Sequence, residues 1–227
     1  MANQPDYGTV FGHWRKACGS VWTDYTHHAF VEGMRDGTLP RAAFLHYLKQ
    51  DYIFLIHFSR AWALAAAKSE TLEEMKIAAG TVNALVNEEL QLHIETCARE
   101  GISETDIMAT SEATANLAYT RYVLEAGYSG DFLDLMAALA SCVLGYGEIG
   151  LRLKETGSSD AYQEWIDTYS GPEYQDACQA VGALLDSAVL NRLGKDYLKA
   201  PRWTALSRRF DKATELEVGF WEMGLNP

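Results

Sequence analysis

One stretch, Asp131–Glu155, most constrains the fold because it is apolar at the spacing of a long helix. Four of its apolar residues fall on one helix face: Leu135, Leu139, Ile149 and Leu153. Cys142 and Tyr146 lie on that same face, four residues apart. Cys142 is therefore either a small core residue, as most buried cysteines are, or a reactive thiol among core side chains.

The rest of the chain repeats this helical period and contains no alternating run of β-branched residues that would predict a strand. We therefore predict an all-α fold of about eight helices in one domain, residues 1–227. Capping residues, Gly and Pro set the expected ranges. These are 9–34 with a possible break at Gly19, 40–68, 71–101, a start at Ser103, 111–127, 131–157, a short helix from 159 or 160 through Trp165, 172–193 and 202–223.

Charge and cysteine usage exclude several classes of protein. The net charge of -12 in 227 residues argues against nucleic-acid binding and against an anionic membrane surface. No apolar run is expected to reach the length of a membrane span, and the N-terminus lacks the pattern of a signal peptide. The four cysteines lie far apart and form no metal-binding pair. We expect a cytoplasmic protein with reduced thiols and no membrane or nucleic-acid partner.

Two carboxylates occupy positions where a helical stripe should be apolar. Asp51 lies between Leu48 and Leu55, and Glu217 lies between Ala213 and Phe220. A buried carboxylate requires a partner, which is either a neighbouring side chain or a ligand. An apolar setting raises the pKa of a carboxyl, so Glu217 would suit a general acid, although a structural hydrogen bond explains it equally well.

Several tyrosines also fall within helical patterns. Tyr119 lies mid-helix, and Tyr169 lies near the end of the segment WIDTYS. Each alone resembles an ordinary core aromatic, whose hydroxyl usually finds a partner when it is buried. Together with the thiol and the two carboxylates, they indicate one polar pocket inside a helical bundle.

Two other patterns are interpreted as structural. Residues 145–150 read GYGEIG, but the dinucleotide fingerprint needs a preceding strand, so these glycines are expected to allow close helix packing. Glu89 and His93 have the spacing of helical di-iron ligands, yet all six histidines lie in the first half of the chain. We expect no metal, and we expect this pair to orient one another or to support the pocket.

Six segments, in this order, resemble the TenA/thiaminase II family: QDYIFL, EExxxH, AYTRY, SCxxGYGEIG, YQEWIDTYS and LEVGFWEMG. The resemblance covers nearly the whole chain. It implies a heme-oxygenase-like helical bundle, usually a homotetramer. It also implies an aminopyrimidine aminohydrolase that needs no cofactor. Such an enzyme cleaves the exocyclic carbon–nitrogen bond of thiamin or of aminomethylpyrimidine, and its product, hydroxymethylpyrimidine, is salvaged into thiamin.

The resemblance also implies roles for particular residues. Cys142 would be the nucleophile and Glu217 the acid that protonates the leaving group, while Asp51 would hold the pyrimidine edge. Five aromatic residues would complete the substrate site: Phe54, Tyr119, Tyr146, Tyr169 and Phe220. Phe54 departs from the family pattern, which often has tyrosine there, so one hydroxyl contact and the substrate preference are open. Two alternatives remain, a di-iron oxidase on the same scaffold and a non-catalytic ligand-binding or regulatory bundle.

Overall fold

The computed structural model describes residues 4–226, and every regular element in that range is helical. The chain divides into two compact units. Unit 1 contains the chain up to Leu39 and Met136–Val218, and unit 2 contains Pro40–Leu135 and the chain from Gly219. The predicted fold class, an all-α protein, is confirmed. That the whole chain forms one domain stays a prediction.

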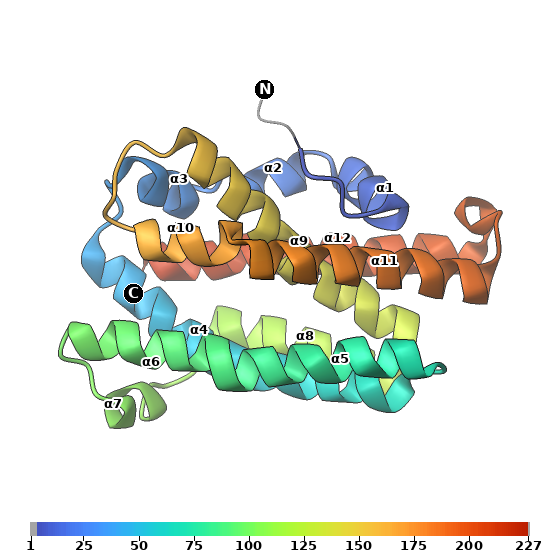
Figure 1. Ribbon diagram of the computed structural model, residues 1–227, viewed down its shortest axis with the longest axis horizontal. Coiled ribbons are helices and arrows are strands. Elements are labelled where there is room, and N and C mark those ends of the chain that lie inside the picture. The colour runs from blue at the N-terminus through green and yellow to red at the C-terminus, as the bar shows by residue number, and fades with distance from the viewer. Residues whose placement is uncertain (1–3, 227) are drawn as a thin grey trace. The chain divides into compact units, whose positions relative to one another are not determined.

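Unit 2 is built around the long helix α4 (Arg41–Lys68), which α5, α6 and α8 flank (Figure 1). The other elements of this unit are α5 (Leu72–Ala84), the π-helical turn η1 (Leu85–Glu89), α6 (Leu90–Arg99), α7 (Glu104–Met108) and α8 (Thr114–Ser129). Thr71 and Glu74 form the predicted capping box at the start of α5. Ser103 and Asp106 form another before α7.

Unit 1 has the N-terminal helices and most of the C-terminal half (Figure 1). Its complete helices are α1 (Thr9–Cys18), α2 (Ser20–Thr26), α3 (Ala29–Asp36), α10 (Gln163–Ser170), α11 (Pro172–Leu193) and the short 3-10 turn η2 (Tyr197–Lys199). The unit division falls inside α9 (Phe132–Thr156) and α12 (Pro201–Leu225). The Asp186 carboxylate accepts hydrogen bonds from the backbone N–H groups of Thr9 and Val10, which caps the start of α1.

The described chain contains more helices than the eight expected, because short helices and one irregular turn divide the predicted segments. The range 9–34 becomes three helices, and η1 interrupts the range 71–101. The short helix through Trp165 is preceded by Tyr162, not by Ser159 or Asp160 as predicted, and it ends at Ser170, where Gly171 and Pro172 follow. The helix predicted to stop at Gly127 continues to Ser129, because this glycine serves packing: a Cβ there would lie 2.8 Å from a methyl group of Leu64.

Helix α9 also corrects one expectation about membranes. By length and composition it is apolar enough to span a bilayer, contrary to the sequence prediction that no such run exists. The whole of its most apolar 18-residue window is nevertheless buried, which is the behaviour of a core helix.

Candidate functional site

Asp51 lies in the middle of α4 and is almost fully buried, with 3% of its surface exposed. Its Oδ2 atom lies 2.7 Å from Nε2 of His93 on α6, and it accepts a hydrogen bond of 3.2 Å from the hydroxyl of Tyr47. His93 is buried as well, and its Nδ1 atom lies 2.9 Å from the backbone oxygen of Glu89. The predicted partner of the buried carboxylate is therefore a histidine from another helix.

Burial lowers the pKa of His93, but the hydrogen bond and charge of Asp51, with a smaller contribution from Glu89, outweigh burial and raise that pKa above its usual 6.5. Both ring nitrogens are occupied by these contacts, so neither remains to bind a metal. Within residues 4–226 no three His, Cys, Asp or Glu side chains form a group that could hold a metal ion. Of the two expectations for Glu89 and His93, contact between them is observed, through the backbone oxygen of Glu89.

Three of the predicted substrate-binding residues form one aromatic group in unit 2. Phe54 lies one helical turn after Asp51, and its ring centroid is 5.0 Å from that of Tyr119 and 5.3 Å from that of Phe220. All three side chains are buried. Such contacts are favourable beyond the apolar area they bury. The structure thus brings Phe54, Tyr119 and Phe220 together, and their role in binding substrate stays a prediction.

Hydrogen bonds from Gln50, the residue before Asp51, hold the start of α8, the helix that carries Tyr119. The side chain of Gln50 donates to the backbone oxygen of Ser111 at 2.9 Å and accepts from the N–H of Ala113 at 3.0 Å. Asn116 donates to the backbone oxygen of Gln50 at 2.8 Å. Because these bonds hold the segment before α8 in a non-helical conformation, the helix begins at Thr114 and not at Ser111 as predicted.

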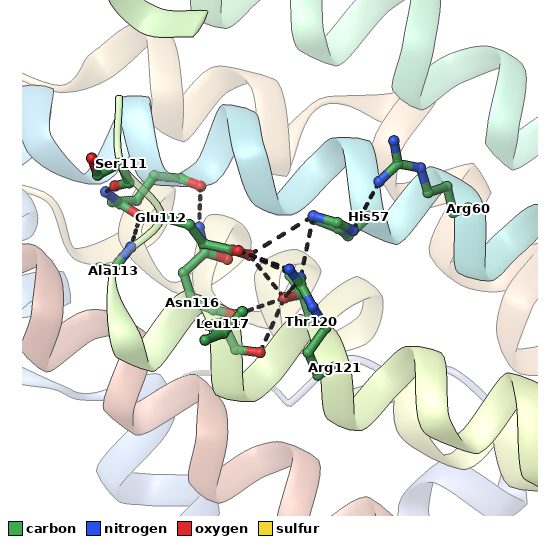
Figure 2. A network of polar contacts seen from close by, with 10 residues as sticks. His57, Arg60, Ser111, Glu112, Ala113, Asn116, Leu117, Thr120 and Arg121 are labelled. Carbon is green, nitrogen blue, oxygen red and sulfur yellow. Dashed lines mark hydrogen bonds and ion pairs between the residues drawn. The ribbon is translucent and has the colours of Figure 1, made fainter. Parts of the chain in front are cut away.

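Figure 2 shows the same end of α8 continuing into a polar network at the surface. Arg121 makes two hydrogen bonds to the Glu112 carboxylate, at 3.0 and 2.9 Å. Thr120 donates to Glu112 at 3.1 Å, and Arg121 also lies 3.2 Å from His57. Exposed pairs of this kind contribute little individually, but together they fix the start of α8.

In unit 1, Tyr146 and Tyr169 belong to a second aromatic group. The ring of Tyr146 lies 5.0 Å from that of Tyr169 and 5.8 Å from that of Trp165 on α10. Trp165 and Tyr169 are 4.4 Å apart. Cys142 lies one turn before Tyr146 on α9 and is 8% exposed. The structure therefore places two of the predicted tyrosines together: Tyr146 on α9, the helix of Cys142, and Tyr169 on α10.

The glycines of the GYGEIG segment allow close packing, as predicted. A Cβ at Gly145 would lie 2.3 Å from the ring of Tyr25, and one at Gly150 would lie 2.6 Å from the backbone of Tyr169. Between them, Glu148 is paired with Arg15 at 2.8 Å and accepts from the Trp22 indole at 3.0 Å. No helix begins at this segment, which lies inside α9.

One side chain missed by the sequence analysis joins the elements of this second group. The Nε2 atom of Gln175 donates to the backbone oxygen of Tyr169 at 2.8 Å and to that of Gly147 at 3.2 Å. Its Oε1 atom accepts from the Tyr7 hydroxyl at 2.6 Å. We call this set, Tyr7 and Gln175 with the two carbonyls, the Gln175 brace. It links the N-terminal segment, α9, α10 and α11.

Glu217 lies on α12 and is 1% exposed, so the prediction that it is buried is confirmed. Its helical neighbours Ala213 and Phe220 are buried as well. That Glu217 faces Cys142, and that the residues of the two units line one pocket, stay predictions.

The described chain is helical, and it buries two carboxylates, Asp51 and Glu217, and a thiol, Cys142, within its helices; these features define its class of protein. The model of the TENA/THI-4/PQQC family matches residues 15–226, and the chain belongs to that family.

Similar proteins agree with this assignment. An aminopyrimidine aminohydrolase of Halalkalibacterium halodurans is 34% identical over 209 residues, which are 91% of this chain and 91% of that protein. A crystal structure described as a TenA family transcription regulator from Silicibacter sp. TM1040 is 63% identical, with a TM-score of 0.96 over 97% of this chain and 98% of that one. A Shewanella denitrificans domain of unknown function is only 13% identical, but it shows the heme-oxygenase-like fold, with a TM-score of 0.72 over 93% and 90% of the two chains.

Proposed function

We propose that the protein is an aminopyrimidine aminohydrolase of thiamin salvage, which hydrolyses the exocyclic carbon–nitrogen bond of thiamin or of an aminomethylpyrimidine. At the family level, relatives with that name support a hydrolase acting on carbon–nitrogen bonds. The observation that carries the proposal for this chain is the buried Asp51 carboxylate, held by His93 and Tyr47 beside the aromatic group of Phe54, Tyr119 and Phe220.

In this proposal Asp51 binds the edge of the aminopyrimidine by a charge-assisted hydrogen bond to its amino group. The aromatic side chains contact the faces of the ring. Because position 54 is phenylalanine, it contributes ring contact and no hydroxyl group to the substrate.

Cys142 is the proposed nucleophile. Its thiolate forms a bond to an electron-poor ring carbon, and the adduct then expels the substituent on the exocyclic carbon. The electron pair of the broken carbon–nitrogen bond goes to the leaving nitrogen, which receives a proton from Glu217 when it leaves as an amine. Water then adds to the exocyclic carbon and gives a proton back to the Glu217 carboxylate. The bond to sulfur breaks, its electron pair returns to the Cys142 thiolate, and hydroxymethylpyrimidine is released. Neither metal nor organic cofactor is required by these steps.

The test is a mass-spectrometric assay of the purified protein with 4-amino-5-aminomethyl-2-methylpyrimidine and, separately, with thiamin. Formation of hydroxymethylpyrimidine from either substrate supports the proposal, and the ratio of the two rates identifies the preferred one. Binding of the pyrimidine with no turnover of either substrate would instead favour the non-catalytic, ligand-binding alternative.

We further propose that the protein acts in the cytoplasm as a homotetramer. Light scattering coupled to size-exclusion chromatography tests the assembly, because a tetramer of this 25.2 kDa chain has a mass of about 100 kDa. A monomeric mass at micromolar concentration would refute it.

A further inference from the structure

The hydrogen bonds of His93 determine where its protons lie. The backbone oxygen of Glu89 can only accept, so the Nδ1 atom 2.9 Å away must carry a hydrogen. A neutral imidazole with its hydrogen on Nδ1 has a lone pair on Nε2. That lone pair would point at a carboxylate oxygen 2.7 Å away, which is repulsive unless a proton lies between them. The geometry therefore places one further proton in the bond between His93 and Asp51.

The same contacts orient the carboxylate. Both the histidine and the Tyr47 hydroxyl bond to Oδ2 of Asp51, at 2.7 and 3.2 Å. Among residues 4–226, the other carboxylate oxygen, Oδ1, has no hydrogen-bond partner. Oδ2 thus holds the Asp51 side chain in place, and Oδ1 is available to a ligand.

We propose that His93 is a positioning residue, an imidazolium that pairs with Oδ2 of Asp51 and turns its Oδ1 atom toward the amino group of the substrate. This inference takes the identity of the ligand from the proposed function. The protonation of the His93 ring can be tested without any substrate.

Electrostatics support this assignment. A carboxylate as buried as Asp51 is costly unless it is paired, and an imidazolium supplies both the opposite charge and a hydrogen bond. The described titratable groups that face His93 are Asp51 and Tyr47 from α4 and Glu89 from η1. The two carboxylates both favour the charged ring, and their combined effect exceeds that of burial.

The first experiment reads the protonation of His93 directly. In protein labelled with 15N-histidine, we expect both ring nitrogens of His93 to remain protonated at pH 7.5. The signals of His46 and His57 should be those of neutral rings, because burial lowers their pKa values below 6.5. The two ring-nitrogen signals of His93 are assigned by their disappearance in His93→Gln. A neutral His93 ring at pH 7 would overturn the inference.

The second experiment measures binding of hydroxymethylpyrimidine, the proposed product, by calorimetry between pH 5 and pH 8. His93→Gln keeps a side-chain donor but no charge, so we expect about tenfold weaker binding at pH 7. The variant lacks the titrating imidazole, so the part of the pH dependence that His93 gives the wild type should be absent. His46→Gln, on α4 and outside these contacts, is the matched control and should bind as the wild type does.

The outcomes separate the two proposals. Equal affinity and an unchanged pH profile in His93→Gln would overturn the positioning role, as would a variant that only loses thermal stability. Absence of binding by the wild type would overturn the proposed function and the substrate part of this inference, whereas the nitrogen signals would still decide whether the ion pair exists.

Discussion

The four cysteines lie in different chemical settings, although all are buried. Burial raises the pKa of Cys18 and of Cys178 to about 12, and burial also raises the pKa of Cys97. A nucleophilic cysteine must ionise, so a raised pKa disfavours these three thiols as nucleophiles near neutral pH. The family resemblance indicates Cys142, on α9, as the nucleophile, and this role stays a proposal.

Cys142→Ser should reduce pyrimidine turnover by on the order of 1000-fold or more, because a serine hydroxyl is a far weaker nucleophile at neutral pH. The matched control is Cys18→Ser, a substitution of another buried thiol that should leave turnover within about twofold. Initial rates by mass spectrometry, with circular dichroism to check folding, provide the comparison. Wild-type rates in Cys142→Ser would contradict the assignment of the nucleophile.

Glu217→Gln should slow the two substrates unequally. Release of ammonia from aminomethylpyrimidine requires a proton on the leaving nitrogen, so its rate should fall on the order of 100-fold. Thiamin should be affected less, because its thiazolium nitrogen leaves as a neutral thiazole without a proton. Single-turnover rates for both substrates are the measurement. Equal slowing would indicate that Glu217 positions the substrate or acts as a base.

His93 should also link stability to pH. Its pKa is raised in the folded state, so the folded protein binds this proton more tightly than the unfolded chain does. The resulting stabilisation is complete below pH 6.5 and is lost as the pH rises through the higher folded-state pKa. Urea unfolding at several pH values should show this loss in the wild type. The slope should be absent in His93→Gln, and its persistence there would assign it to another group.

At the scale of elements, the Gln175 brace predicts a coupled effect on α9 and α10. Gln175→Leu removes three hydrogen bonds and leaves two backbone oxygens and the Tyr7 hydroxyl without this partner. We expect a loss of about 1–3 kcal/mol of unfolding free energy, together with a lower kcat. Gln179→Leu on the same helix removes a bond to the backbone oxygen of Asp6 only, and it should affect stability much less and kcat not at all. Equal kcat values in both variants would show that the brace is purely structural.

Helical period and capping residues predicted most elements, because those signals are local. Thr71 and Glu74, for example, form the capping box that their spacing predicts. The start of α8 was predicted wrongly because Gln50, more than sixty residues earlier, holds the preceding segment. Gln175 was missed for the same reason: an amide outside an apolar stripe has no sequence signal, and its three partners come from other parts of the chain. Asp51 and Glu217 could be found because each interrupts an apolar stripe.

At the scale of the whole molecule, the net charge of -12 argues against one kind of regulator, a DNA-binding protein. A DNA-binding surface releases counterions by placing basic groups against phosphates, and an acidic chain repels the duplex. We expect no retardation of random-sequence DNA at 10 micromolar protein and 50 mM salt. Micromolar binding that weakens steeply with salt would contradict this and would favour a regulatory role.

The π-helical turn η1 sets the rotation of α6 relative to α5. A π turn accommodates one more residue than an α-helix does over the same path. If Leu85–Glu89 adopted α-helical geometry with the same number of residues, α5 and α6 would join as a continuous α-helix. One of them would then have to rotate by about 100° relative to the other. The helix would be more regular, yet His93 would no longer point at Asp51. The irregular turn thus acts as a spacer that sets the direction of one side chain.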